Sequence, residues 1–423
     1  MLKLLISTLL FSFIFSIIKI PFKTKENPIK QGLTYVDSRV RNYEMGEIFI
    51  GEPSQKIRLI IATSYYHFII ANSKEKIDEI YSNISSSTSS LISTEKKIYY
   101  YNNYKGGFLA QDNFMFYNEK DKKKSYVNIP FLINDYDDET SGLLGLNLLK
   151  ERNDEDLNFV KVLLEKKVIA SSIWTIKYLN DNEGELIIGD YPHKYNNNYD
   201  ENFLKFTKVE INYNKDWKIQ FDEIKFDNDI QSSSISKFGI FVIENGLIKG
   251  PSEYEILFLQ KLNKTNNCFE LKREFSLVYY YCNKNTDIKL LPIISFYHRE
   301  LNFTFNLTYE DLFIEKNGKY YLLMSFNKNH RLNEWTLGRI FMKKYEMIFD
   351  PENKLIGFYN DYKGKSFNMS FTILIIFIII IIGLIVIVNH IMKLKRRKTR
   401  ANEIDEVYDY VPANQEILGI KDI

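Results

Sequence analysis

YEMGEIFIGEPSQKIRLIIATSYYH, residues 43–67, has the pattern of two strands joined by a turn. Alternating apolar residues predict a strand that ends near Ile50, and Gly51 to Ser54 has the composition of a turn. A second, more apolar strand follows and runs into a polar loop, Ala62-Thr63-Ser64. The pattern therefore predicts a hairpin that presents a loop to a functional site.

A second stretch, GIFVIENGLIKGPS at 239–252, echoes the first, and its Val242 follows Ala62 by 180 positions. The two stretches resemble the catalytic loops of pepsin-like aspartic peptidases, where each loop reads Asp-Thr-Gly. Here the loops read Ala62-Thr63-Ser64 and Val242-Ile243-Glu244. The resemblance implies that Ala62 and Val242 stand at the positions of the two catalytic aspartates.

The end of the chain's large domain carries the most specific part of this resemblance. WTLGRIFMKKYEMIFDPENKLIGF, residues 335–358, is similar to the family's closing signature, and SGLLGL at 141–146 is similar to the element packed beneath the first loop. The resemblance covers about 40–359. It implies a mainly β, bilobal pepsin-like double β-barrel with few short helices.

The degenerate loops bear directly on the chemistry that the family performs. Pepsin-like catalysis uses two nearby carboxyl groups that share one proton, so that one activates water and the other protonates the substrate carbonyl. Alanine and valine side chains do neither. Glu244 with His67 is the one rebuilt site that the sequence suggests, and we expect both instead to be surface or cleft-wall residues. Thr63 is expected to keep half of a brace between the loops, because its counterpart is Ile243.

KIYYYNNYKGGFLAQDNFMF, residues 97–116, predicts two strands around a hairpin at Gly106-Gly107. It resembles the family's flap, and counting back from Asp112 places Tyr100 at the flap tyrosine. An ordinary aromatic strand pair is the alternative. NFVKVLLEKK at 158–167 predicts a short helix.

Composition excludes several classes of function. The 56 Lys and Arg residues nearly balance the 54 Asp and Glu residues, giving a formal net charge of +2, so no general field favours a nucleic-acid partner. The five histidines are scattered and no CxxC motif occurs, so we expect no metal site and no cofactor.

The apolar run from Leu4 to Ile18, preceded by Lys3, has the length of a signal-peptide core. An uncleaved anchor is the alternative, since no clear cleavage site is visible. The IKIPFKTK stretch that starts at Ile18 is similar to the start of the family's propeptides. We therefore expect entry into the secretory pathway.

FTILIIFIIIIIGLIVIV, residues 371–388, carries no charge and is followed by a basic cluster at 393–400. Extended to residue 392 it would reach about 27 to 33 Å as a helix, enough to cross a bilayer. The positive-inside rule then places the C-terminus in the cytosol, so we expect a single-pass type I membrane protein. Tyr408 and Val411 form a pattern that resembles signals read by sorting adaptors.

Cys268 and Cys282 are the two cysteines of the sequence and are expected to pair, because an oxidising lumen leaves each no other partner. Closing that loop would contribute about 3 kcal/mol on the chain-entropy model. The sequence also has glycosylation acceptors in the expected lumenal part, namely Asn83, Asn263, Asn302 and Asn306.

The expected division of the chain is a signal peptide at 1–18, a short propeptide-like segment at 19–38, lobes at 39–183 and 184–360, a stalk at 361–370, a transmembrane helix at 371–392 and a cytosolic tail at 393–423. The favoured hypothesis is a catalytically inactive, membrane-anchored peptidase homologue that binds a peptide or protein ligand through its cleft or lobe surface. An active aspartic endopeptidase and a structural coat protein are the alternatives.

Overall fold

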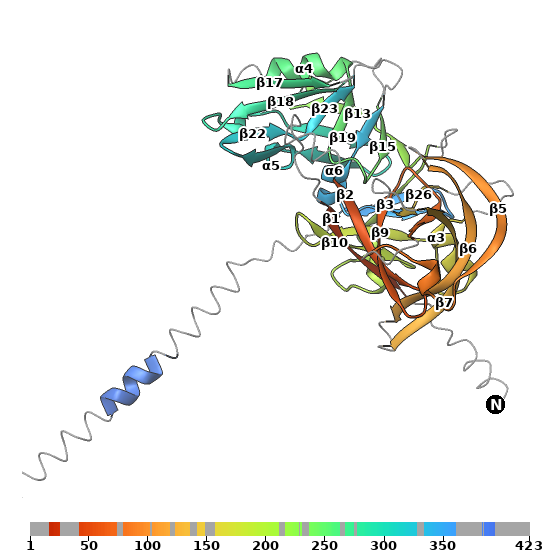
Figure 1. Ribbon diagram of the computed structural model, residues 1–423. Coiled ribbons are helices and arrows are strands. Elements are labelled where there is room, and N and C mark those ends of the chain that lie inside the picture. Colours follow the sequence, from red (N-terminus) through yellow and green to blue (C-terminus); the bar gives the residue numbers. More distant parts are fainter. Residues whose placement is uncertain are drawn as a thin grey trace, which may run out of the picture. The chain divides into compact units, whose positions relative to one another are not determined.

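The computed structural model describes residues 17–25, 42–73, 79–101, 104–118, 123–135, 142–148, 157–210, 216–227, 229–230, 237–262, 267–274, 277–327, 334–360, 383 and 385–393. Contacts divide the chain into two compact units, residues 1–361 and 362–423. Within the described residues of the first unit, β-strands dominate and the helices are short (Figure 1). The mainly β prediction is confirmed.

The largest sheet counts thirteen strands among the described residues, and it takes β11, β25 and β26 from the second half of the chain and most of its other strands from the first. Hairpin β2–β3 lies at its middle, as residues 43–67 predict, with the turn at 51–54. Strand β8 runs parallel to β3. In sheet order the strands are β11 (Leu204–Lys208), β26 (Leu355–Tyr359), β25 (Ile348–Asp350), β9 (Trp174–Tyr178), β10 (Glu183–Ile188), β1 (Ile18–Lys25), β2 (Tyr43–Ile50), β3 (Gln55–Ala62), β8 (Gly142–Gly145), β4 (Phe68–Asn72), β7 (Lys123–Asp135), β6 (Tyr104–Asn118) and β5 (Ser90–Tyr101).

Two smaller sheets are formed by residues 218–337. Among the described residues the first holds β12 (Lys218–Gln220), β15 (Phe238–Phe241), β24 (Trp335–Leu337), β16 (Ile248–Pro251), β23 (Met324–Asn327), β18 (Leu277–Asn283), β22 (Lys319–Leu322), β21 (Phe313–Lys316) and β17 (Cys268–Glu274). The second holds β14 (Asp229–Ile230), β13 (Glu223–Phe226), β19 (Ile294–His298) and β20 (Phe303–Leu307). Strand β24 runs parallel to β15, as β8 does to β3.

The helices cover the sheets at a few places. Among the described residues of the first unit they are α3 (Phe159–Glu165), α4 (Glu253–Leu262), α5 (Tyr309–Leu312) and α6 (Arg339–Lys344), and the 3-10 turns there are η1 (Asn83–Ser85), η2 (Pro192–Lys194), η3 (Glu201–Phe203) and η5 (Ile288–Leu290). Helix α3 confirms the helix predicted at 158–167, two residues shorter at its C-terminal end. Asn158 caps it, because its side chain accepts a hydrogen bond from the Lys161 N–H.

Strand β1 contains the first part of the propeptide-like segment. It pairs with β10 along residues 18–23 and with β2 along residues 22–25. The side chains of Ile18, Ile20 and Phe22 are buried in the core. Ile18–Lys25 is thus an inner strand of the sheet.

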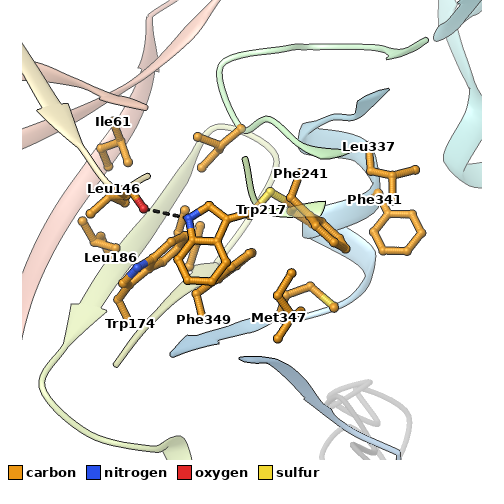
Figure 2. Packing of buried hydrophobic residues seen from close by; sticks show 14 of the residues in the cluster. Ile61, Leu146, Trp174, Leu186, Trp217, Phe241, Leu337, Phe341, Met347 and Phe349 are labelled. Atoms are coloured by element: carbon orange, nitrogen blue, oxygen red, sulfur yellow. Dashed lines mark hydrogen bonds between the residues drawn. The ribbon is translucent and has the colours of Figure 1, made fainter. Parts of the chain in front are cut away.

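Large aromatic side chains fill the core between the lobes (Figure 2). Trp174 stacks on Phe349 at 4.0 Å between ring centroids and meets Trp217 edge-on at 5.7 Å. The indole N–H of Trp217 donates to the carbonyl of Leu146 at 2.8 Å. Trp217 comes just before β12 and Leu146 just after β8, so this bond joins the two halves of the fold.

The described part of the second unit is helical at residues 383 and 385–393. No helix among the described residues is long and apolar enough to cross a membrane. Most of the span predicted at 371–392 lies outside the described residues, as do the tail residues Tyr408 and Val411.

Candidate functional site

The two predicted loops meet. Ala62 ends β3 opposite Gly145 of the parallel strand β8. Val242 follows β15, and its N–H donates to the carbonyl of Leu337 at the end of the parallel strand β24. Each loop therefore leaves the end of a strand that is paired in parallel, and the two copies face each other.

Thr63 forms half of a brace between the loops. Its hydroxyl donates to the Phe241 carbonyl at 2.9 Å and accepts from the Ile243 N–H at 3.0 Å. The side chain of Ile243 is buried and has no hydroxyl to return such bonds. The predicted asymmetry of the brace is confirmed.

Glu244 reaches across from the second loop and binds the first. One carboxylate oxygen accepts from the Thr63 N–H at 3.0 Å, and the other accepts from the Ser64 N–H, also at 3.0 Å. The Ser64 hydroxyl donates to the same carboxylate. Glu244 is half-buried, and backbone donors of the facing loop hold its side chain.

The sequence suggests a site made of Glu244 and His67. The described hydrogen bonds of the Glu244 side chain go to Thr63 and Ser64 and not to His67. The His67 ring instead lies 3.8 Å from the ring centroid of Tyr66, its neighbour in the chain. Glu244 and the two hydroxyl groups of Thr63 and Ser64 are what the structure brings together.

Two asparagines fix the path of the first loop. The Asn147 side chain donates to the Ser64 carbonyl at 3.2 Å, and the Asn158 side chain donates to the carbonyls of Tyr66 and Gly145 at 3.0 and 3.1 Å. Neither residue was predicted from the sequence to belong to the site. The sequence does carry one signal for Asn158, because an asparagine at a helix start often caps the helix, and this side chain caps α3.

Gly145 lets β8 approach this loop closely. A Cβ atom at this position would lie 2.5 Å from the carbonyl carbon of Tyr66 and 2.7 Å from the backbone nitrogen of His67. No side chain fits there unless the backbone shifts. The glycine in the SGLLGL element is therefore explained by its contact with the loop.

The chemistry of this arrangement follows from its donors and acceptors. Ala62 and Val242 contribute no polar side-chain atoms, and Ala62 is fully buried. Glu244 contributes one carboxylate, and both of its oxygens accept backbone N–H groups. Among the described residues no group of three or more metal-ligating side chains could hold a metal ion.

The predicted flap is a hairpin of β5 and β6, but its turn is not at Gly106-Gly107. Tyr101 pairs with Tyr104, so the connection lies at 102–103. Gly107 is instead within β6, where a Cβ atom would lie 2.5 Å from the Ile133 carbonyl oxygen. Tyr100 pairs with Lys105 beside the turn, and its side chain lies outside the described residues.

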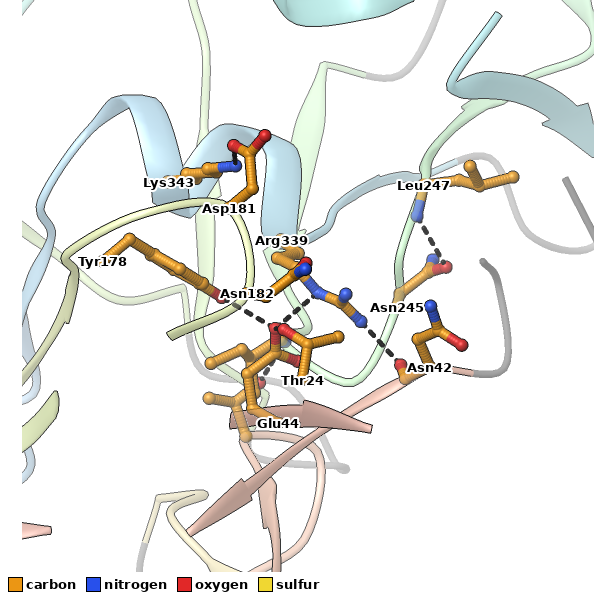
Figure 3. Close-up of polar contacts among 12 residues, drawn as sticks. Thr24, Asn42, Glu44, Tyr178, Asp181, Asn182, Asn245, Leu247, Arg339 and Lys343 are labelled. Carbon is orange, nitrogen blue, oxygen red and sulfur yellow. Dashed lines mark hydrogen bonds and ion pairs between the residues drawn. The ribbon is translucent and has the colours of Figure 1, made fainter. Parts of the chain in front are cut away.

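A buried ion pair joins the lobes near the second loop (Figure 3). The Arg339 guanidinium at the start of α6 lies 2.7 Å from the Glu44 carboxylate of β2, and it donates to the Asn42 carbonyl at 2.6 Å. Burial raises the pKa of the Glu44 carboxyl, and the charge of Arg339 opposes that shift. This pair was not predicted from the sequence, because its partners are far apart in the chain.

The remaining predicted sites have separate locations. Cys268 and Cys282 form the predicted disulfide, which links facing positions of β17 and β18. Asn83 lies in η1 and is half-buried, whereas Asn302, just before β20, and Asn306, within β20, are exposed. Asn263 lies outside the described residues.

Comparison with known proteins gives the family. The model of the eukaryotic aspartyl protease family matches residues 43–360. The chain belongs to this family. The predicted resemblance to pepsin-like aspartic peptidases is therefore confirmed.

Two curated proteins are similar to this chain at low sequence identity. Plasmepsin VII of Plasmodium falciparum is 26% identical over 249 residues, which cover 51% of this chain and 53% of that protein, about half its length. Renin of Echis ocellatus is 23% identical over 338 residues, which cover 74% of this chain and 79% of that protein.

Solved structures confirm the fold. Basic 7S globulin from soybean is similar with a TM-score of 0.60 and 14% identity, covering 82% of this chain and 98% of that chain. Conglutin gamma from lupine seeds has the same TM-score with 13% identity, and the match covers 82% of this chain and 95% of that chain.

Proposed function

We propose that this chain is a catalytically inactive, membrane-anchored member of the aspartyl protease family that binds a peptide or protein partner. The observation that carries the proposal is the Glu244 carboxylate, bound to the backbone of Thr63 and Ser64 where two loops without aspartate meet. The fold is retained, and the acids that the family's reaction requires are replaced.

The replaced residues argue against peptide hydrolysis. Aspartic peptidase chemistry needs two carboxyl groups about 3 Å apart that share a proton and hold a water molecule. Ala62 and Val242 supply neither carboxyl. Glu244 supplies one carboxyl, whose two oxygens already accept hydrogen bonds from the protein itself. One carboxylate in this state has no partner with which to share a proton.

An active aspartic endopeptidase is the second candidate, favoured by the family match at residues 43–360. It would require Glu244 to leave the Thr63 and Ser64 N–H groups and to act with another acid. Asp-Thr-Gly and Asp-Ser-Gly are both absent from the sequence. The inactive member therefore fits the residues better.

The placement in the cell is part of the proposal. The apolar N-terminal run supports a signal peptide, and residues 371–392 with the basic cluster after them support a single span with a cytosolic C-terminus. The glycosylation acceptors and the Cys268–Cys282 disulfide suit a lumenal or extracellular domain. Tyr408 and Val411 are the residues that a sorting adaptor would read.

Peptide capture tests the proposal. The purified full chain in detergent is mixed with a photo-crosslinkable peptide library, and crosslinked peptides are identified by mass spectrometry. We expect saturable capture of intact peptides. Recovery of peptides cut at a defined bond would contradict the inactive assignment, and a lack of any saturable capture would favour a structural coat protein.

A further inference from the structure

Lys249 of β16 lies on the face of its sheet that is turned away from the core. Its neighbour Ile248 is fully buried, and a Cβ atom at Gly250 would lie 2.9 Å from the Trp335 ring, so these two positions mark the core face. Side chains alternate between the two faces of a strand, and Lys249 therefore points to the opposite face. It is half-buried there.

This face borders the loop at Val242. Lys249 pairs across the sheet with Thr336 of β24, and Thr336 pairs with Ile240 of β15. Val242 follows Ile240 by two positions and continues the ladder, because its N–H donates to the Leu337 carbonyl. Neighbouring strands lie about 4.8 Å apart, so Lys249 is about 10 Å from the strand that leads into this loop. Thr336 and Ile240 are half-buried, as Lys249 is.

Among the described residues, Lys249 has no hydrogen-bond or ion-pair partner for its ammonium. Lys218, which pairs with Ile240 in the same row of the sheet, shows the contrast, because its ammonium lies 2.5 Å from the Glu334 carboxylate. Burial lowers the pKa of the Lys249 ammonium, and no described charge opposes that shift. A half-buried cation without a countercharge costs free energy, so an anionic ligand would stabilise it.

A second polar group without a partner stands beside Lys249. Ser325 of β23 occupies the paired position on the neighbouring parallel strand. It is fully buried, and its hydroxyl has no hydrogen-bond partner among the described residues. Two positions before this pair, Leu247 and Leu323 pack together in an apolar cluster. The face is therefore polar at one spot, where buried donors still need an acceptor.

The chemistry of this spot selects a carboxylate. The lysine ammonium is a compact positive charge with three donors on a flexible stem. A carboxylate supplies one negative charge and only acceptors. Recognition of phosphate commonly uses clusters of basic side chains, whereas the other cation of this row, Lys218, is already bound to Glu334. A polypeptide carries carboxylates on aspartate, on glutamate and at its C-terminus.

We infer that Lys249 binds a carboxylate of the partner polypeptide and makes this chain select acidic ligands. The inference rests on the proposed polypeptide-binding function and names the ligand chemistry of that same site. A peptide that crosses the face beside the Val242 loop would place one of its residues against Lys249. The ion pair would supply the countercharge that the described residues do not offer, and it requires no proteolytic chemistry.

Charge-scanning peptide libraries test the inference. The probes are acetylated, amidated octapeptides that contain benzoylphenylalanine as a photo-crosslinker. One position at a time is fixed as glutamate, glutamine or lysine, and the remaining positions are random among uncharged residues. The full chain in detergent is crosslinked to each library, and captured peptides are counted by mass spectrometry. We expect about tenfold more capture with glutamate than with glutamine at one position, and the least with lysine.

Substitutions at one position show whether Lys249 is responsible. Lys249→Met keeps the apolar stem without the charge, so the preference for glutamate should vanish while uncharged peptides are still captured. Lys249→Glu should reverse the preference, so that lysine is captured more than glutamate, and a merely structural role would not produce this reversal. Lys205→Met changes an exposed lysine of β11 and should keep the wild-type preference. Tryptophan fluorescence confirms that every variant is folded.

A further library distinguishes the two sources of a carboxylate. Its peptides contain only uncharged residues and end in a free C-terminal carboxylate instead of an amide. If Lys249 binds a chain end, the free acid should be captured about tenfold more than the amide, and Lys249→Met should remove the difference. If Lys249 binds a side chain, the preference should follow internal glutamate.

Several outcomes would overturn the inference. Saturable capture without any preference for a carboxylate would contradict it while leaving the proposed function standing. A preference for glutamate that persists in Lys249→Met would place the acid-binding group elsewhere. No capture of any library would contradict both the inference and the proposed function.

Discussion

Glu244 stands where the family's second loop carries a glycine, and it gives that position a new structural role. The family's glycine has no side chain, whereas this carboxylate accepts two N–H groups of the facing loop. Hydrogen bonds to a charged acceptor are stronger than neutral ones, so Glu244 should stabilise the meeting of the two lobes. This residue therefore adds a structural contact between the two loops.

Replacing Glu244 with glutamine tests this role. The amide keeps one acceptor oxygen but turns its NH₂ group toward a backbone N–H, so one buried donor loses its partner. We expect Glu244→Gln to lower the free energy of unfolding by about 1–3 kcal/mol, measured by denaturant unfolding with tryptophan fluorescence. Glu352→Gln, at an exposed position, should change it by less than about 0.5 kcal/mol. Equal effects would contradict the role.

Glu346 gives the lobe a defined pH dependence. Burial raises the pKa of its carboxyl, against the opposing effects of the Tyr199 hydroxyl, which donates to it at 2.5 Å, and of Lys177. Above the ordinary pKa of 4.5 the folded state therefore binds more protons than the unfolded state, and stability falls as the pH rises toward the raised folded pKa.

Glu346→Gln should remove this contribution. In unfolding measurements at several pH values above 4.5, the wild-type chain should lose stability with rising pH more steeply than the variant. The variant at the exposed position 352 serves as control and should keep the wild-type slope. A variant slope equal to that of the wild type would show that Glu346 is not the titrating group.

At the scale of elements, the Trp217 bond to Leu146 links the start of β12 to the end of β8 (Figure 2). Trp174 offers a matched comparison, because it is equally buried and its indole nitrogen has no hydrogen-bond partner. Trp217→Phe should cost about 1–3 kcal/mol more than Trp174→Phe, since it also leaves a buried carbonyl unpaired. Chemical denaturation measures both, and equal costs would show that the bond contributes nothing.

The sequence predicted the central hairpin and the helix after Asn158, because both depend on local patterns. It also predicted the disulfide, because the sequence offers each cysteine no other partner. The flap turn could not. Gly106-Gly107 has turn composition, but Gly107 is needed where β6 crowds the Ile133 carbonyl, and that contact depends on the neighbouring strand β7.

The Glu244 contact was also beyond local reasoning. Its partners Thr63 and Ser64 are 181 and 180 positions away, and no motif of the family places an acid there. The ion pair of Glu44 and Arg339 could not be predicted for the same reason. Such contacts depend on how the two lobes meet. The family resemblance predicts that they meet, but it does not predict which side chains bind each other.

At the scale of the described lobes, the Glu44 and Arg339 pair holds β2 against the start of α6 (Figure 3). Arg339→Met would leave the Glu44 carboxylate buried without its countercharge. We expect a loss of about 3–5 kcal/mol in the free energy of unfolding. Thermal and denaturant unfolding of the full chain measure it.

A double variant shows whether the loss comes from the stranded charge. Glu44→Leu combined with Arg339→Met removes both charges together and should recover most of the stability, because apolar pairs often replace buried ion pairs at little cost. If the double variant is as unstable as Arg339→Met alone, packing of the arginine stem, and not the ion pair, holds these elements together.

We propose that the meeting loops at Ala62 and Val242 support no peptide hydrolysis. The most direct measurement is the rate of peptide-bond cleavage by the purified full chain, followed by mass spectrometry with a diverse peptide library from acid to neutral pH, with and without pepstatin. We predict no cleavage above that of a Glu244→Ala control at any pH. Pepstatin-sensitive cleavage that Glu244→Ala abolishes would contradict the claim.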